Sequence, residues 1–231
     1  MAITITGCEP QIVAPLLQSQ ESRSIHVTGS GLVTGEPDIA TIYLGVSVEK
    51  ETVAEAREEA AIAMTAVIDS LKTNDIAEND IQTERFSIYP QYNYTDNGRE
   101  LRGYSVNNTV RAKVRKLESL SAIIDDAAEA GGDTVVVNSI QFMIEDATAL
   151  QMQARSLAVK DAEAKAKTLA DASGVTLGKP ITITETSYTV PPPVAYAAEA
   201  AFSDDSARSA TPIEAGELTV TVNITVVYEI E

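Results

Sequence analysis

The sequence predicts an α+β protein in which helices pack on a mainly antiparallel sheet. Two observations carry this prediction. Several segments alternate apolar and polar residues with a period of two, and three others repeat their apolar residues with the helical period of about 3.6. After a short first strand, these segments run β-α-β-β, then a helix, then β-α-β-β. This order favours two βαββ units joined by a helix.

The strands are predicted from period-two alternation. Apolar side chains occupy every second position from Ile42 to Val48 and from Leu218 to Ile230, and the same pattern runs from Tyr104 to Val114 with Asn108 as its only interruption. Each such strand should bury one face and leave the other in solvent. Residues 134–144 and 179–189 have the composition of two further strands.

Three segments carry an apolar stripe at helical spacing: residues 52–72, 116–130 and 147–172. Gly131–Gly132 should end the second helix, and Ser173–Gly174 the third. The inner face of the third helix is mostly alanine, which would let it lie close to a sheet, although helix propensity alone also explains alanine. We expect this face to consist of Leu150, Ala154, Leu157, Ala158, Ala162, Ala166, Leu169 and Ala170.

The chain divides into a tether and one folded domain. Residues 1–22 are the predicted flexible N-terminal tether, because the stretch 9–22 is rich in Pro, Gln, Ser and Glu and has little periodicity. Residues 23–231 form the predicted domain. The stretches "VSVEKETVAEAR" and "FMIEDATALQMQAR" both pass from a strand end into a helix, which favours two diverged βαββ repeats at about 36–115 and 134–231.

Charge excludes one class of partner. The chain has 17 basic and 34 acidic residues, a formal net charge of −17. Such a surface repels phosphate backbones, and the densest basic run, Arg111 to Lys116, alternates with small apolar residues as the solvated face of a strand does. We therefore expect no nucleic acid as a partner. No segment has the apolar length of a membrane span.

Residue counts also restrict the chemistry. One cysteine and one histidine nearly exclude disulfides, zinc sites and Cys/His nucleophilic pairs. We expect no metal, no cofactor and no catalytic residue, with His26 an exposed strand residue. Gly29-Ser30-Gly31 is too short for a phosphate-binding loop and predicts a bend between two strand segments.

Cys8 is a candidate lipidation site. Ile5-Thr6-Gly7-Cys8 resembles the end of a bacterial lipobox, but the basic and apolar regions of a signal peptide are missing upstream. A chance Gly-Cys pair in a tail is the alternative, and the two interpretations stay open. A lipid on Cys8 would be the chain's only connection to a membrane.

A hairpin rich in tyrosine is predicted around the turn Thr95-Asp96-Asn97-Gly98. By the period of two, Tyr92 and Tyr94 lie on one face and Tyr89 on the other, with Tyr104 across the hairpin. Cross-strand packing explains these rings, and a surface for ligands is the alternative. A ligand surface usually brings tryptophan as well, which the chain lacks.

The segment 191–216 is too long for a structureless connection inside a compact domain, so it is either functional or mobile. Pro191–Pro193 stiffens its base, and Tyr196, Phe202 and Ile213 are apolar residues without an obvious use in their own domain. The strand that follows, residues 217–230, could lie at a sheet edge and invite a partner strand. Together they predict a homo-oligomer.

Three motifs resemble the SIMPL domain, also called DUF541. The central one spans Ile81, Thr83, Pro90, Tyr92, Tyr94, Gly103 and Tyr104. The opening is similar in Gly29, Gly31 and Pro37-Asp38, and the late helix in Ala162, Ala166, Leu169, Ala170, Gly174 and Gly178. This resemblance covers about residues 24–231. It implies an exported envelope or periplasmic protein; some members are linked to oxidative-stress defence or known as surface antigens. A mammalian branch is described as a kinase-associating adaptor. No agreed catalytic residue comes with the family.

The leading hypothesis is a non-enzymatic, self-associating cell-envelope protein that supports stress tolerance or surface structure. The alternative is a binding module for a small or peptide ligand, which would use the tyrosine hairpin and the 191–216 loop. Acid–base chemistry at Glu84, Asp96 or Glu100 ranks third, because scattered carboxylates in so acidic a chain carry little information.

Overall fold

The structure is a computed structural model that describes residues 23–96, 98–189 and 211–231. It confirms the α+β class. In chain order the strands and longer helices are β1 (Ser24–Gly35), β2 (Ile39–Lys50), α1 (Val53–Thr73), β3 (Ile81–Thr95), β4 (Gly98–Val114), α2 (Leu120–Gly131), β5 (Val135–Met143), α3 (Thr148–Ser173), β6 (Leu177–Thr189) and β7 (Leu218–Ile230).

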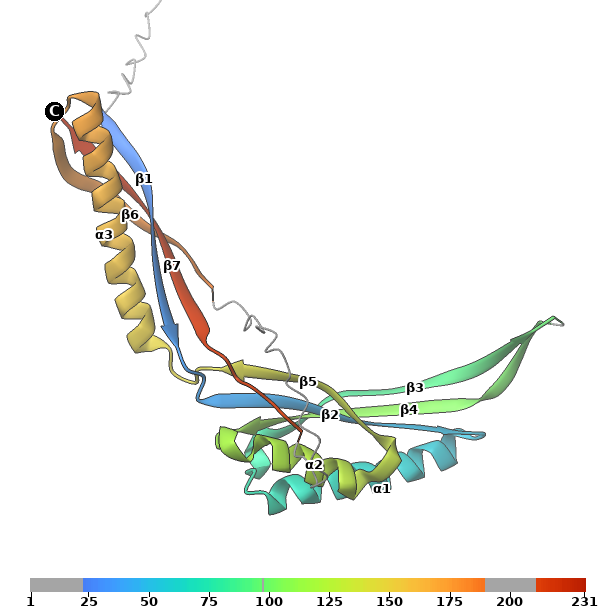
Figure 1. Ribbon diagram of the computed structural model, residues 1–231. Helices are drawn as coiled ribbons and strands as arrows, with labels where there is room; N and C mark the ends of the chain where they lie inside the picture. The colour runs from blue at the N-terminus through green and yellow to red at the C-terminus, as the bar shows by residue number, and fades with distance from the viewer. Residues whose placement is uncertain (1–22, 97, 190–210) are drawn as a thin grey trace, which may run out of the picture.

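The strands form two separate antiparallel sheets. One has the order β3-β4-β2-β5 and the other β1-β7-β6. In Figure 1 the two sheets make an L, with α1 and α2 beneath the four-stranded sheet and α3 along the outer side of the three-stranded one. The expected edge position of the last strand is wrong, because β7 pairs with β1 on one side and β6 on the other.

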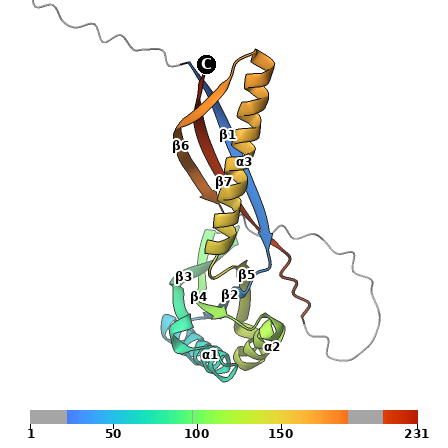
Figure 2. The same ribbon diagram turned by 90° about the vertical axis from the view of Figure 1, so that its left-hand side faces the viewer.

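The two sheets share a common arrangement. In the first, a hairpin (β3–β4) has β2 beside its second strand; in the second, a hairpin (β6–β7) has β1 beside its second strand. β5, which precedes α3 in the chain, pairs instead with β2 in the first sheet. β1 and β2 follow one another through Glu36, Pro37 and Asp38, so one extended stretch serves both sheets (Figure 2).

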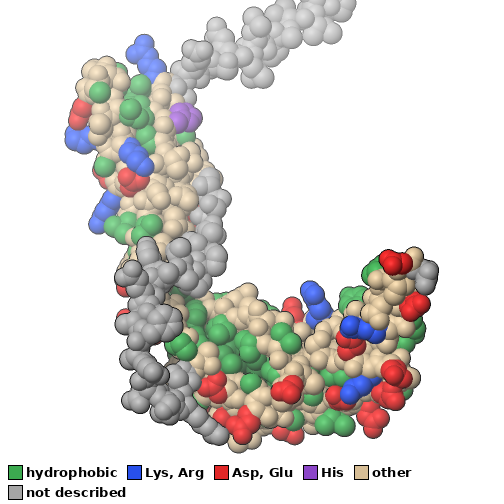
Figure 3. Space-filling view, turned by 45° about the vertical axis from the view of Figure 1, so that its right-hand side comes forward, with side chains coloured by type: hydrophobic (Ala, Val, Ile, Leu, Met, Phe, Trp, Pro, Cys, Tyr) green, Lys and Arg blue, Asp and Glu red, His purple; other side chains and the backbone are tan. Residues whose placement is uncertain are grey.

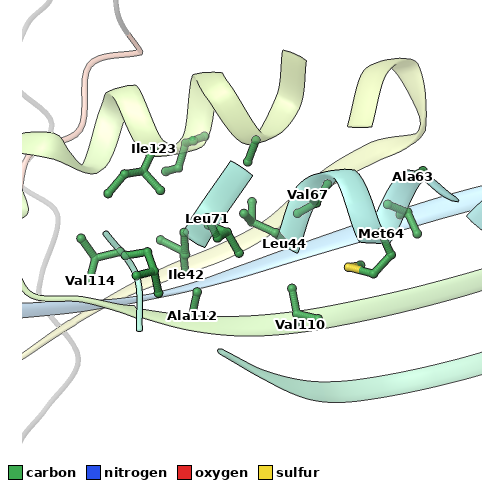
Figure 4. Close-up of a cluster of buried hydrophobic side chains, with 14 of the residues drawn as sticks. Ile42, Leu44, Ala63, Met64, Val67, Leu71, Val110, Ala112, Val114 and Ile123 are labelled. Carbon is green, nitrogen blue, oxygen red and sulfur yellow. The ribbon is translucent and has the colours of Figure 1, made fainter. Parts of the chain in front are cut away.

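The larger hydrophobic core lies between the four-stranded sheet and helices α1 and α2 (Figure 4). Ile42 and Leu44 of β2 are fully buried, because helices cover the face of β2 on which they lie while β4 and β5 flank its edges. The predicted helical stripes are confirmed at the residues that reach this core from α1 and α2: Ala56, Ala60, Met64, Val67, Leu71, Leu120, Ile124 and Ala127.

The smaller core depends on an unusually close approach of α3 to β1. A β-carbon added to Gly31 would lie 1.8 Å from the carbonyl oxygen of Ala154, and one added to Gly29 would lie 2.0 Å from that of Ala158. The two glycines therefore serve helix packing, and the predicted bend at 29–31 is wrong, since β1 is continuous from Ser24 to Gly35.

The alanine face of α3 is confirmed in its centre and wrong at its flanks. Every fourth residue of one row is buried, namely Ala154, Ala158, Ala162, Ala166 and Ala170. Leu157 and Leu169, which were expected on this face, are 44% and 48% exposed. Because small residues allow backbone contact, the helix touches the sheet along one narrow row and holds its leucines clear of it.

α3 also covers part of the outer edge of β1. Asp161 accepts a hydrogen bond from the backbone N–H of Ser30 at 2.8 Å, and Lys165 donates one to the carbonyl oxygen of Thr28 at 3.0 Å. The two side chains form an ion pair at 2.6 Å. β1 is the edge strand of its sheet, so this edge latch, Asp161 and Lys165, occupies backbone groups that another strand could otherwise bind.

Replacing Gly31 with alanine should destabilise the protein by about 1–3 kcal/mol, since the new methyl group would displace the backbone of α3. Urea unfolding of Gly31→Ala measures this loss. Ser30→Ala is the matched control, because the neighbouring side chain points away from the helix and the substitution keeps the backbone N–H that Asp161 binds. Equal stability of the two variants would show that α3 does not lie this close to β1.

Candidate functional site

The tyrosine hairpin extends beyond the rest of its sheet. The last residue pair between β2 and β4 joins Lys50 to Tyr104, so the part of β3 and β4 beyond it, residues 91–103, is a ribbon of two strands alone. Figure 1 shows this ribbon projecting away from α1 and α2. An isolated two-stranded ribbon is at best marginally stable in water unless something packs against it. We call residues 91–103 the ribbon.

The predicted packing role fits Tyr104 and Tyr92 but not Tyr94, because the three rings differ in how far they are buried. Tyr104 is half-buried at the base of the ribbon, between Lys50 and Pro90. Tyr92 is half-buried, and the Arg99 guanidinium lies 4.0 Å from its ring centroid in a cation–π contact. Tyr94 is 81% exposed, so the packing role is wrong for this ring. Because Arg99 covers one face of Tyr92, only its other face could stack on a ligand.

Further apolar side chains are exposed on or near the ribbon. Phe86 is 55% exposed, Leu101 52% and Tyr89 57%. By register, Phe86 and Leu101 lie on the same side as Tyr92 and Tyr94, the side that helix α1 covers nearer the centre of the sheet. Since α1 begins only at Val53, it does not extend along the ribbon, and Phe86 lies on β3, the edge strand of the sheet. This side of the hairpin is therefore an apolar surface that lacks its helix.

The segment that leads into β7 has a use inside its own domain, contrary to prediction. Ile213 packs against the larger core. The hydroxyl of Thr211 donates to Asp125 at 2.8 Å, and its carbonyl oxygen accepts from Ser121 at 2.7 Å. Ile213 is thus an intramolecular contact. Cys8, Tyr196 and Phe202 lie outside the described residues.

A charged cluster lies where the two sheets meet. Arg115, at the end of β4, forms ion pairs with Asp80 and Glu145, and Lys113 binds Glu145 at 3.1 Å. The backbone N–H of Glu145 in turn donates to Asp38 at 2.7 Å. We call these five residues the corner cluster. It ties two of the chain crossings between the sheets, the one before β2 and the one after β5, to the four-stranded sheet.

The electrostatics of the corner cluster favour a structural role. The hydrogen bond from Arg115 lowers the pKa of Asp80, and the hydrogen bond from Lys113 lowers that of Glu145. Both carboxylates therefore stay ionised near neutral pH, where a group with so low a pKa is a weak general base. Two hollows of about 370 and 280 Å³ flank Asp80, and charged side chains that are already paired line them.

Sequence reasoning missed the corner cluster. It interpreted Arg111–Lys116 as a solvated strand face, but Arg115 finds acids 35 and 30 residues away. The density of that basic run in an acidic chain was the available signal. The three carboxylates considered for acid–base chemistry do not gather: Glu84 faces Arg111 at 3.8 Å, Asp96 lies in the turn of the ribbon, and Glu100 pairs with Asn93.

Neither a metal site nor a membrane-spanning helix emerges from the described ranges. Over residues 23–96, 98–189 and 211–231, no three His, Cys, Asp or Glu side chains are grouped so that they could hold an ion. In the same ranges, no helix combines the length and hydrophobicity needed to cross a bilayer. His26 is exposed, as predicted, with its Nε2 3.1 Å from the hydroxyl of Ser24.

Two antiparallel sheets in an L, each covered by helices on its outer side, define this molecule as a two-sheet α+β protein. Residues 25–228 match the family model SIMPL, described as "protein of unknown function (DUF541)". The chain therefore belongs to the SIMPL family, as its three motifs predict.

Relatives of the chain span bacteria and mammals. It is 36% identical over 217 residues to the 26 kDa periplasmic immunogenic protein of Brucella melitensis, covering 90% of this chain and 84% of that protein. It is 31% identical over 147 residues to the uncharacterized protein YggE of Escherichia coli K12, covering 64% and 59%. It is also 26% identical over 181 residues to the human interleukin-1 receptor-associated kinase 1-binding protein 1, covering 76% and 66%.

Alanine substitutions should rank the tyrosines by burial. Tyr104→Ala should cost about 1–2 kcal/mol of unfolding free energy, because half-buried aromatic area is lost. In the monomer, at low protein concentration, Tyr94→Ala should change it by less than about 0.5 kcal/mol, as is usual for an exposed side chain. Thermal and urea unfolding measure both. A Tyr94→Ala loss as large as that of Tyr104→Ala would mean that the exposed ring is packed against something in solution.

Acid should weaken the corner cluster. The pKa values of Asp80 and Glu145 are lower in the folded protein than in the unfolded chain, so their contribution to stability is present above the unfolded values of about 4 and is lost as pH falls through the folded ones. Asp80→Asn should lower the free energy of unfolding at neutral pH. It should also make this free energy fall less steeply between about pH 5 and 3. Asp69→Asn, on the exposed side of α1, is the control; identical pH slopes for both variants would contradict the expectation.

Proposed function

We propose that this chain is a non-enzymatic, self-associating protein of the bacterial cell envelope, exported to the periplasm. The apolar side of the hairpin is the observation that carries self-association. Tyr94 and Leu101 are each more than half exposed on a ribbon that no described helix covers, and Phe86, which precedes the ribbon on β3, is 55% exposed on the same side. Burying them on a second copy would stabilise a ribbon that is marginal by itself.

The envelope location is supported by the Brucella relative, whose name calls it periplasmic and whose sequence is 36% identical to this one. Support of stress tolerance or of surface structure is the cellular role we attach to such an assembly, following the family resemblance. Cys8 remains the candidate point of lipid attachment.

A non-enzymatic role fits the described residues. The carboxylates with altered pKa values in the corner cluster are held in ion pairs, and Glu84, Asp96 and Glu100 point to no common centre. The alternative of a binding module for a small or peptide ligand on the tyrosine hairpin has less support, because Arg99 already stacks on Tyr92.

Light scattering tests self-association. The intact chain should have a mass that is a multiple of 24.6 kDa, and assembly should strengthen as salt screens repulsion between copies of net charge −17. Joint replacement of Tyr94 and Leu101 by serine should shift the protein toward the monomer. Ile62→Ser is the matched control, because Ile62 is a 67% exposed apolar residue on α1.

Three outcomes would overturn the proposal. The first is a monomer of the intact chain at both low and high salt. The second is an oligomer whose mass the ribbon variant does not reduce, and the third is an equal reduction by Ile62→Ser. Compared as monomers at low protein concentration, the ribbon variant and the unmodified chain should have unfolding free energies within about 0.5 kcal/mol of each other, since both side chains are exposed in the monomer.

A further inference from the structure

The inside of the L is formed by sheet surface rather than by helices. α3 packs on one face of β1 and β7, and α1 packs on one face of β2 and β4. In both sheets the opposite face is uncovered by any described helix, and the two uncovered faces meet at the inner corner of the L (Figure 1). We call this combined surface the inner face.

The inner face of the three-stranded sheet is rich in hydroxyl groups. Register places Thr28 opposite Thr225, Leu32 opposite Thr221 and Thr34 opposite Thr219. These side chains alternate with the buried residues that face α3, so they point to the other side. From Ser24 to Thr34 on β1, and from Thr219 to Val227 on β7, no Asp, Glu, Lys or Arg is present.

The four-stranded sheet continues this surface with hydroxyl and amide groups. Asn107 donates to the hydroxyl of Ser105 at 3.2 Å, and Asn138 reaches the hydroxyl of Thr109 at 3.5 Å across the strand that separates them. The contact between Asn138 and Thr109 passes over Gly45 of β2. A β-carbon added to Gly45 would lie 2.9 Å from the Asn138 amide nitrogen, so a larger residue would obstruct this contact. The half-buried ring of Tyr43 lies next along β2.

Charge on the inner face is confined to its four-stranded half, where register places Arg111 opposite Tyr43 and Lys113 opposite Thr41. The chain has 34 acidic residues, and helices carry many of them, for example Glu58, Asp125 and Glu163. Figure 3 shows red side chains along the lower, outer surface of the four-stranded part. At the corner, Arg111 and Lys113 are paired with Glu84 at 3.8 Å and Glu145 at 3.1 Å.

These features restrict the partner. A polyanion would meet the repulsion of a net charge of −17, and the nearest cations are already paired. A flat apolar protein surface would desolvate threonine and asparagine groups without satisfying their hydrogen bonds. An uncharged, hydroxyl-rich polymer avoids both the repulsion and the loss of hydrogen bonds. Its hydroxyls donate and accept hydrogen bonds as Ser, Thr and Asn groups do. Tyr43 supplies a ring for the apolar face of a sugar.

We propose that the inner face binds an uncharged polysaccharide strand, which lies along the uncovered sheets at the corner of the L. Binding would be weak for each sugar and would accumulate along the strand, since the hydroxyl groups are spread over both sheets and no deep pocket concentrates them. This site is separate from the ribbon, which projects beyond β2.

Hydrogen–deuterium exchange with soluble, uncharged hexasaccharides tests the proposal, because the readout does not depend on oligomer size. The probes are chitohexaose and laminarihexaose at about 1–10 mM, the range suited to a weak site. Either sugar should slow exchange in peptides that cover residues 41–47, 105–109 and 219–227. Peptides from α1 should be unchanged.

Variants make the test specific. Tyr43→Ala and Thr109→Val should each weaken sugar binding at least about fivefold by calorimetry, the loss of roughly one hydrogen bond or ring contact. Thr65→Val on the outer side of α1 is the matched control and should bind as the unmodified chain does.

Three results would overturn the proposal: no protection by either uncharged sugar, protection confined to the outer helices, or tighter binding of an anionic hexasaccharide such as oligogalacturonate. The last result would assign the corner cations as an anion site.

Discussion

The whole molecule depends on one constraint: each sheet needs a strand beside the second strand of its hairpin, and β1 and β2 supply both of these strands in one nearly continuous stretch. β2 carries the most deeply buried part of the larger core, and β1 receives α3 against its glycines. Because the two strands are joined by Glu36, Pro37 and Asp38 alone, the sheets cannot be placed independently. The corner cluster then holds Asp38 and Glu145 at that joint.

The local sequence pattern was sufficient to predict most helices and strands, but it was insufficient to predict how they are arranged in the two sheets. Alternation and helical stripes located β2, β7, α1 and α2 because these elements have one buried and one open face. The same alternation could not show that β7 is central, since a strand's neighbours lie far away in sequence. Nor could it show that Leu157 and Leu169 stay exposed. The rotation of α3 about its own axis is determined by the backbone contact between the alanine row and β1.

The candidate site was predicted in part for a similar reason. The tyrosines could be placed on a hairpin from the turn residues and the period of two, but the end of β2 at Lys50 determines that the ribbon is left without a helix. Sequence patterns likewise contain no sign that both sheets turn their helix-free faces to the same side. That arrangement follows from the joint between β1 and β2, and it separates a helical outer surface from an inner surface made of strands (Figure 1).

The edge latch links the docking of α3 to the molecule's tendency to aggregate. Asp161 and Lys165 occupy the Ser30 N–H and the Thr28 carbonyl only while the helix lies on the sheet. If α3 detaches in a partial unfolding event, the same step uncovers the alanine row, the apolar face of β1 and β7, and an unpaired strand edge. A species with α3 detached would therefore expose two kinds of adhesive surface in a single step, and conditions that hold α3 in place should protect the protein from irreversible loss.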